Sequence, residues 1–181
     1  MRIVEGSNVD LINPFPLSEV KRLVGWGHCF KSMFLVDGGP SGEQELMEYY
    51  KQLLPRCMTF GIIDKANKLG YKHEAPLIGC FIQEPPSTVT NSYVHVTSTR
   101  KAWGSGMVDE AAKLALTTIF TDQPALLRVS AAILSTNAPA KAFVKRLGFK
   151  QDGQFKNYVI QSGTPKAISH FAFMRDDLWG S

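Results

Sequence analysis

The fold is decided by the stretch Val94-His-Val-Thr-Ser-Thr-Arg-Lys-Ala-Trp-Gly-Ser-Gly-Met-Val-Asp109, which joins a strand pattern to a helix pattern through a basic turn. Residues 93–97 alternate and are rich in aromatic and β-branched side chains, which predicts a half-buried strand. Two glycines, Gly104 and Gly106, allow the backbone to turn sharply and to approach a ligand closely. Apolar residues then recur at helical spacing, which predicts a helix that begins near Ser105.

This turn has the properties of a phosphate-binding site. The unpaired N–H groups and the positive dipole end of the predicted helix face the turn, and Arg100 and Lys101 add two full charges. A pyrophosphate would therefore meet several donors at once. Taken alone, the motif is equally consistent with an ordinary tight connection, because it lacks the third glycine of a dinucleotide-binding turn and the pattern of a phosphate-gripping loop.

Composition narrows the class of protein. The 181 residues predict one domain, residues 1–181, large enough to form a core without disulfides. The net charge of +4 suits a protein that binds a polyanionic cofactor and leaves nucleic acid as a less favoured partner. No Cys-x-x-Cys is present and the four histidines are far apart, so we expect no metal site. Neither a membrane span nor a signal peptide is visible, so we expect a cytoplasmic protein.

The other patterns predict the order strand, two helices, three strands, helix, strand, helix and two strands. The second helix is expected to begin at a capping-box spacing over 41–44 and to end at Pro55. We interpret both N-terminal helices as ordinary surface helices, the alternative being one wall of a cleft. A buried strand over 126–134 precedes a helix closed by Gly148, and a hairpin over 154–174 ends the chain. These elements predict an α+β fold with a mixed sheet.

A second segment, Asn137-Ala-Pro-Ala-Lys-Ala-Phe-Val-Lys-Arg-Leu-Gly-Phe149, follows downstream of the turn. Together the two segments resemble the Gcn5-related N-acetyltransferase (GNAT) family. In that family a Gln/Arg-x-x-Gly-x-Gly/Ala turn binds the pyrophosphate of acetyl-coenzyme A, and an Asn-led helix ends in Gly-Phe. Here the first motif reads Lys101-Ala-Trp-Gly-Ser-Gly106. The C-terminal part, from Gly153 to Trp179, is similar to the branch that acetylates the N-termini of ribosomal proteins, and stand-alone chains of this kind also occur in bacteriophage genomes.

The resemblance implies a mostly antiparallel sheet of six to seven strands, splayed between strands 4 and 5 and flanked by about four helices. It implies acetyl-coenzyme A as co-substrate, and a protein N-terminus or a lysine as the amine acceptor of a monomer or homodimer. Direct transfer is expected because no cysteine lies where a covalent relay would need it. Two alternatives stay open: the same fold acting on a small amine or a nucleobase, and a catalytically inactive coenzyme-binding module that acts through protein contacts.

The resemblance also assigns the residues that bind the coenzyme. The backbone of Val94 and Val96 is expected to pair with the pantetheine arm like an added strand. Asn137 and Lys141 are expected beside the coenzyme. The pyrophosphate would lie on the turn itself, which comprises Arg100, Lys101, Ala102, Trp103, Gly104, Ser105, Gly106 and Met107. Lys101 departs from the usual Gln or Arg and supplies a point charge without a fork of donors.

The acid–base residues follow the family pattern less closely. Where many members have a tyrosine, this chain has the inert Val144, so Ser135 or a water is left to assist the departing thiolate. His95 is the candidate general base, because imidazole exchanges protons near neutral pH. Glu84 is the next candidate. The alternatives are a histidine that is hydrogen-bonded within the sheet and a carboxylate at a solvated strand end.

Overall fold

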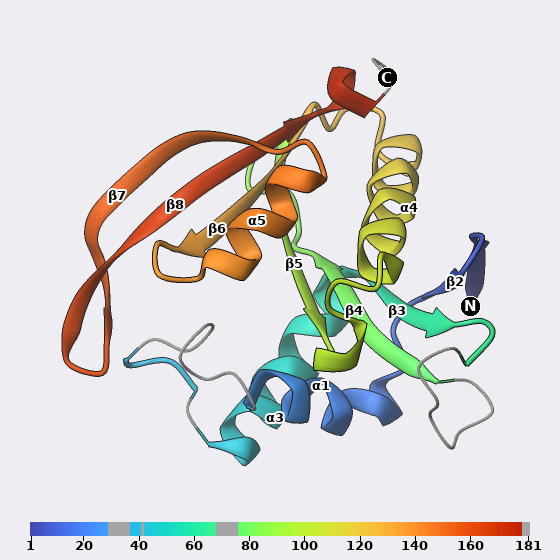
Figure 1. Ribbon diagram of the computed structural model, residues 1–181, viewed down its shortest axis with the longest axis horizontal. Coiled ribbons are helices and arrows are strands. Elements are labelled where there is room, and N and C mark those ends of the chain that lie inside the picture. Colours follow the sequence, from blue (N-terminus) through green and yellow to red (C-terminus); the bar gives the residue numbers. More distant parts are fainter. Residues whose placement is uncertain (29–36, 41, 68–75, 179–181) are drawn as a thin grey trace.

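The computed structural model describes residues 1–28, 37–40, 42–67 and 76–178 (Figure 1). In chain order its strands and helices are β1 (Arg2–Glu5), β2 (Val9–Asn13), η1 (Leu17–Glu19), α1 (Val20–His28), α3 (Glu43–Leu53), η2 (Leu54–Arg56), β3 (Met58–Asp64), β4 (Leu77–Gln83), β5 (Asn91–Ser98), η3 (Arg100–Ala102), α4 (Met107–Asp122), β6 (Arg128–Leu134), α5 (Ala138–Arg146), β7 (Lys150–Gln161), β8 (Thr164–Met174) and η4 (Arg175–Leu178). None of the described helices is long and apolar enough to cross a membrane.

The described strands form one mixed sheet in the order β1-β2-β3-β4-β5-β6-β8-β7, in which only β5 and β6 are parallel. The predicted α+β fold with a mostly antiparallel mixed sheet is confirmed. The sheet has one strand more than the six to seven expected, because the sequence-based prediction omitted β2. Two adjacent buried residues, Leu11 and Ile12, interrupt the alternation of β2 and obscure its strand pattern.

Helices cover both faces of this sheet, and each face has its own core. On one face the buried alanines of α4, such as Ala111 and Ala115, allow the helix to lie close to the sheet. On the other face α1 and α3 pack on the sheet through Leu23 and Leu46. Because β4 lies between the two cores, all seven of its residues are buried. The central strands are therefore fixed from both sides.

The sheet opens between β5 and β6. These strands pair only over their first three residues, from Asn91 opposite Arg128 to Tyr93 opposite Ser130. Side chains close the base of the opening: the Ser130 hydroxyl donates to Asn91 Oδ1 at 2.9 Å, and Arg128 Nε donates to Ser130 Oγ at 3.0 Å. Past Tyr93 the strands diverge. The expected splay is thus present, and it lies between β5 and β6 because β2 shifts the strand count by one.

A long hairpin, β7 and β8, arches away from the rest of the sheet (Figure 1). Asp37 attaches the segment 37–40 to the turn of this hairpin. The two carboxylate oxygens of Asp37 accept the N–H groups of Ser162 at 2.9 Å and Gly163 at 2.7 Å, and its own N–H donates to the Ile160 carbonyl at 2.7 Å. The segment that precedes α3 is therefore held against the C-terminal hairpin.

Candidate active site

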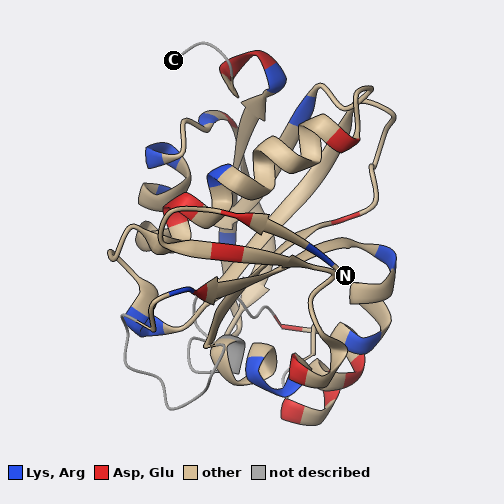
Figure 2. Ribbon diagram, turned by 90° about the vertical axis from the view of Figure 1, so that its right-hand side faces the viewer, with Lys and Arg blue, Asp and Glu red and all other residues tan. Residues whose placement is uncertain are grey.

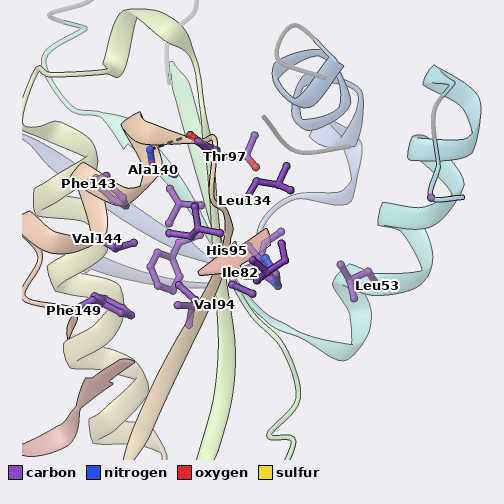
Figure 3. A pocket seen from close by; sticks show the side chains of 18 of the residues that line it. Leu53, Ile82, Val94, His95, Thr97, Leu134, Ala140, Phe143, Val144 and Phe149 are labelled. Carbon is purple, nitrogen blue, oxygen red and sulfur yellow. Dashed lines mark hydrogen bonds between the residues drawn. The ribbon is translucent and has the colours of Figure 1, made fainter. Parts of the chain in front are cut away.

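A cavity of about 420 Å³ fills the opening between β5 and β6. It runs through the sheet, with the side chains of α5 at one end and those of α3 at the other (Figure 3). The β5 strand lines it over residues 94–97, and β6 lines it over residues 131–134. The splay therefore creates a passage from one face of the sheet to the other.

A second cavity of about 240 Å³ lies between the N-terminus of α4 and helix α5. Trp103 and Gly104 of the turn, together with Val108 of α4, form part of its wall. It shares four lining residues with the larger cavity: Val96, Asn137, Ala140 and Phe143. The two cavities are therefore neighbours along one path that leads from the glycine turn into the opening of the sheet.

The glycine turn has the geometry that its sequence predicts. Gly104 and Gly106 have φ values of +72° and +80°, in the left-handed region that glycine adopts without strain. A Cβ on either residue would meet no atom within 4 Å, so the space beside the turn is clear. Ser105 Oγ donates to the Ala102 carbonyl at 2.7 Å and accepts the Met107 N–H at 3.3 Å, which fixes the start of α4.

Positive charge gathers around this turn. Lys and Arg residues of η3 and α5 lie along the edge of the molecule at which α4 begins (Figure 2). Arg146 of α5 bridges to Asp109 in the first turn of α4, with Nε 3.0 Å from Oδ1. Lys141 donates from Nζ to the Ser135 carbonyl at 2.5 Å. Helix dipole, backbone donors and cationic side chains therefore all favour an anion at this end of the path.

The two valines and the asparagine expected at the coenzyme lie on the cavity walls. Tyr93 directs its carbonyl to the N–H of Glu84, the residue that follows β4, at 2.9 Å. Because backbone groups alternate in direction along an antiparallel strand, Val94 and Val96 direct theirs toward β6, from which β5 has begun to separate. Asn137 is buried, lines both cavities and caps α5, with Oδ1 accepting the Ala140 N–H at 3.1 Å.

His95 and Glu84 meet at the α3 end of the passage. His95 lines the cavity, and its Nε2 lies 2.6 Å from Glu84 Oε1. The hydrogen bond from His95 lowers the pKa of the Glu84 carboxyl, and it outweighs the opposing effect of burial. Glu84 is therefore ionised at neutral pH. His95 is thus hydrogen-bonded to a carboxylate, and the two side chains remain 44% and 34% exposed to solvent.

Two tyrosines of α3 belong to the site and were missed. Leu46, Tyr49, Tyr50 and Leu53 line the cavity, so the interpretation of α3 as an ordinary surface helix is wrong. Their spacing, one stripe along a helix, was the available signal. Burial raises the pKa of Tyr50 to about 12. Burial, followed by the charge of Glu84, raises the pKa of Tyr49.

Other predicted residues lie outside the cavity walls. Ser135 lines neither cavity, and its N–H donates to the Ala167 carbonyl at 2.9 Å. Ala102 and Met107 are buried in the core beneath the turn, so their side chains do not face a ligand. Arg100, Lys101, Ser105 and Gly106 lie on the turn without lining either cavity. Within the described ranges, no group of three His, Cys, Asp or Glu could hold a metal ion.

Comparisons with known proteins agree with this geometry. Residues 36–150 match the family model described as an acetyltransferase (GNAT) domain. No curated protein sequence matches the chain. Solved structures with the same fold include the ribosomal-protein-S5-alanine acetyltransferase of Vibrio fischeri, at 16% identity and a TM-score of 0.74, where 98% of this chain aligns with 99% of that one.

Two further structures with this fold hold coenzyme A. RimL, a ribosomal L7/L12 α-N-protein acetyltransferase, has 13% identity and a TM-score of 0.76, with 97% of this chain and 99% of that one covered. The spermidine N-acetyltransferase of Vibrio cholerae, solved with coenzyme A and spermine, has 14% identity and a TM-score of 0.76, with 97% and 100% covered. At these identities the likeness shows the fold.

Proposed function

The chain belongs to the acetyltransferase (GNAT) family, and on that premise we propose that it transfers the acetyl group of acetyl-coenzyme A directly to a primary amine of a protein, an N-terminus or a lysine. One observation carries the proposal: the path from the glycine turn through the splayed sheet ends at the His95–Glu84 pair. Two of the similar structures are acetyltransferases of ribosomal proteins, which supports a protein acceptor.

The described residues fit the coenzyme along this path. The left-handed glycines, the N-terminus of α4 and the basic edge suit its pyrophosphate. The backbone of Val96 faces the opening of the sheet and suits the extended pantetheine arm, which can add to β5 as a strand does. The coenzyme supplies a thioester whose acetyl group would then lie in the opening between β5 and β6. Each segment of the coenzyme thus has a chemically matched surface.

The acceptor would enter from the α3 side, where His95 lies. In the tautomer whose Nε2–H donates to Glu84, Nδ1 is left as the proton acceptor for the ammonium group of the acceptor. The freed amine then forms an N–C bond to the thioester carbonyl carbon as the C–S bond breaks, and the second proton that the nitrogen loses passes to water. The carboxylate of Glu84 stabilises the imidazolium that forms in this step. The pair therefore supplies the base that direct transfer needs.

The leaving-group side of the passage is apolar. Ala140, Phe143 and Val144 of α5 line it, and within the described part of α5 and its cap the only polar side chain on this wall is Asn137. The thiolate accordingly departs without an acid from α5 and takes its proton from water or from the imidazolium of His95. A thiolate is a good leaving group, and backbone N–H groups can stabilise the oxyanion, so the reaction does not require such an acid.

The proposal is tested with acetyl-coenzyme A and three acceptor sets: peptides with free N-termini, N-blocked peptides that contain lysine, and small amines. Release of the coenzyme thiol is followed together with the mass of each acceptor. We expect a mass gain of one acetyl group on a peptide. If only small amines are acetylated, the acetyltransferase activity is retained and the proposal of a protein acceptor is refuted. Coenzyme binding without thiol release on any acceptor would refute the transferase and favour the inactive module.

A further inference from the structure

We propose that the acceptor is a primary amine that carries one positive charge on an apolar body, and that diamines and polyamines are rejected. This inference rests on the proposed transferase function and names the substrate class of the same site. It is carried by the character of the α3 end of the passage: apolar and aromatic walls with a single carboxylate, Glu84, at the reacting histidine.

The walls at this end are built to cover a hydrocarbon group. Most of the described lining near His95 is apolar or aromatic and comes from α3, β4, β6 and β8, with Thr97 of β5, Gly39 and Pro40 beside it: Leu46, Tyr49, Tyr50, Leu53, Ile82, Ala132, Leu134 and Ile168. Figure 3 shows Leu53 across from Ile82 and His95, with Leu134 nearby. The Tyr50 phenol is neutral at physiological pH, because burial raises its pKa to about 12. An alkyl or aromatic body would lose its contact with water here at a gain of roughly 25 cal/mol per Å².

The first positive charge of an acceptor has a partner. Glu84 is ionised, and its Oε1 lies 2.6 Å from His95 Nε2. Carboxylate and imidazole are therefore in contact at the cavity, whose wall also includes Tyr49. An ammonium group between them would meet an opposite charge and an aromatic face. This is the position from which its proton can pass to His95.

A second positive charge would have no partner on the described cavity walls. Asp37 does not line the cavity, and its two carboxylate oxygens accept the N–H groups of Ser162 and Gly163. The glutamates of α3 lie on its exposed outer face, where Glu48 pairs with Lys51 at 3.0 Å and Glu45 accepts the Gly42 N–H at 3.2 Å (Figure 2). No Asp or Glu is among the described residues that line the cavity. A second ammonium held against these walls would thus leave water without gaining a counter-charge from them, which is costly.

The test is a matched pair of acceptors, n-hexylamine and 1,5-diaminopentane, which have the same length and differ by a methyl against an ammonium group. With acetyl-coenzyme A at saturation, we expect kcat/KM for hexylamine to exceed that for the diamine by about 100-fold. Tripeptides that begin with Leu or with Lys repeat the comparison for a protein N-terminus. They show whether the acceptor is a peptide N-terminus or a free amine. Equal or greater kcat/KM for the doubly charged partner in both pairs would overturn the inference.

A variant should reverse the preference. Leu53 lines the cavity and is only partly buried, so Leu53→Glu adds a carboxylate where the second ammonium would lie. We expect its kcat/KM for 1,5-diaminopentane to rise at least about 10-fold, and that for hexylamine to fall. Leu53→Gln, which adds polarity without charge, is the matched control and should leave the diamine rejected. If Leu53→Glu gains no more than Leu53→Gln does, the missing counter-charge is not the cause.

Calorimetric titration of both amines into the protein with coenzyme A separates the two proposals. Tighter binding of hexylamine without any acetyl transfer would contradict the transferase function and retain the acceptor class. Transfer to both amines at equal rates and with equal affinities would retain the function and remove the acceptor class. Absence of binding and of transfer for both amines would refute the inference together with the site.

Discussion

At the scale of the residue, His95 and Glu84 carry the acid–base chemistry. We expect His95→Ala to lower kcat about 100-fold, which is the rate contribution typical of a positioned general base. The KM for acetyl-coenzyme A should stay unchanged. Glu84→Gln keeps a hydrogen bond and loses the charge, so its loss in kcat should be about 10-fold. Steady-state kinetics from pH 6 to 9 check both. A pH profile of kcat/KM that is the same in His95→Ala and in the native chain would show that His95 is not the base.

A second prediction at the scale of the residue concerns the effect of Tyr50 on the stability of the fold at high pH. Its pKa is near 12 in the fold and about 10 in the unfolded chain, so the neutral phenol contributes stability fully below pH 10. That contribution is lost as the pH rises from 10 to 12, when the unfolded chain releases the proton first. The full loss is about 2.7 kcal/mol, of which about 1.4 kcal/mol falls between pH 8 and pH 11, and it should be absent in Tyr50→Phe. Urea denaturation at pH 8 and pH 11 measures it.

A control is needed, since other groups also titrate in this range. Tyr158 is exposed on the hairpin, so Tyr158→Phe removes a phenol that is not buried. The native chain and Tyr158→Phe should lose stability in parallel between the two pH values, whereas Tyr50→Phe should lose less. Parallel loss in all three proteins would mean that the Tyr50 phenol is not confined between α3 and β5.

At the scale of the element, the turn before α4 can be tested through its glycines. Gly106→Ala forces a Cβ into the left-handed region, at about 1 kcal/mol of strain, although no atom lies within 4 Å of that Cβ. Relief of the strain would rotate the turn, so we expect weaker binding of coenzyme A, by about 10-fold. Gly163→Ala, with φ of +71° at the hairpin turn, carries the same strain away from this site. Calorimetry of both variants with coenzyme A compares them.

Two results would contradict the assignment of the pyrophosphate to this turn. If Gly163→Ala weakens coenzyme A binding as much as Gly106→Ala does, the effect is general destabilisation. If neither variant changes the affinity, the pyrophosphate site lies elsewhere. Thermal unfolding of the two variants should show similar losses in Tm, because each substitution adds strain of the same kind at a residue with clear space around it.

Local sequence patterns predicted the helices and strands well where neighbouring residues alone determine the structure. The strand, turn and helix from Asn91 to Asp122 follow from alternation, two glycines and a helical repeat, which are properties of neighbouring residues. The helix α4 begins at Met107, two residues past the expected start, because Gly106 occupies its cap position in the left-handed region. Strand β2 and the cavity-lining face of α3 escaped prediction, since both depend on what packs against them.

At the scale of the whole molecule, the site unites segments that are far apart in sequence. The chain order predicts that His95 and Glu84 belong to adjacent strands, so their contact could have been predicted from the sequence. The contact between Asp37 and the turn at Ser162 and Gly163 was not, because it spans 125 and 126 positions. No local pattern encodes such a pairing. The acceptor end of the passage is therefore the part of the site that only the tertiary structure defines.

Asp37 gives this long-range contact a test. Gly39 and Pro40, just beyond it, line the cavity, so release of Asp37 should loosen that wall. We expect Asp37→Asn, which replaces one acceptor oxygen by a donor that faces an N–H group, to raise KM for the amine about 5-fold, given roughly 1 kcal/mol for an exposed charged hydrogen bond. KM for acetyl-coenzyme A should stay constant, because its site lies at the other end of the path.

The matched control is Asp122→Asn, which removes another exposed carboxylate, 2.6 Å from Arg2, on the far end of α4. Both variants should lose a similar, small amount of Tm, a few degrees at most for about 1 kcal/mol. Only Asp37→Asn should change KM for the amine. An equal rise in both variants, or no rise in either, would mean that the bond between segment 37–40 and the hairpin stabilises the fold without shaping the entrance for the acceptor.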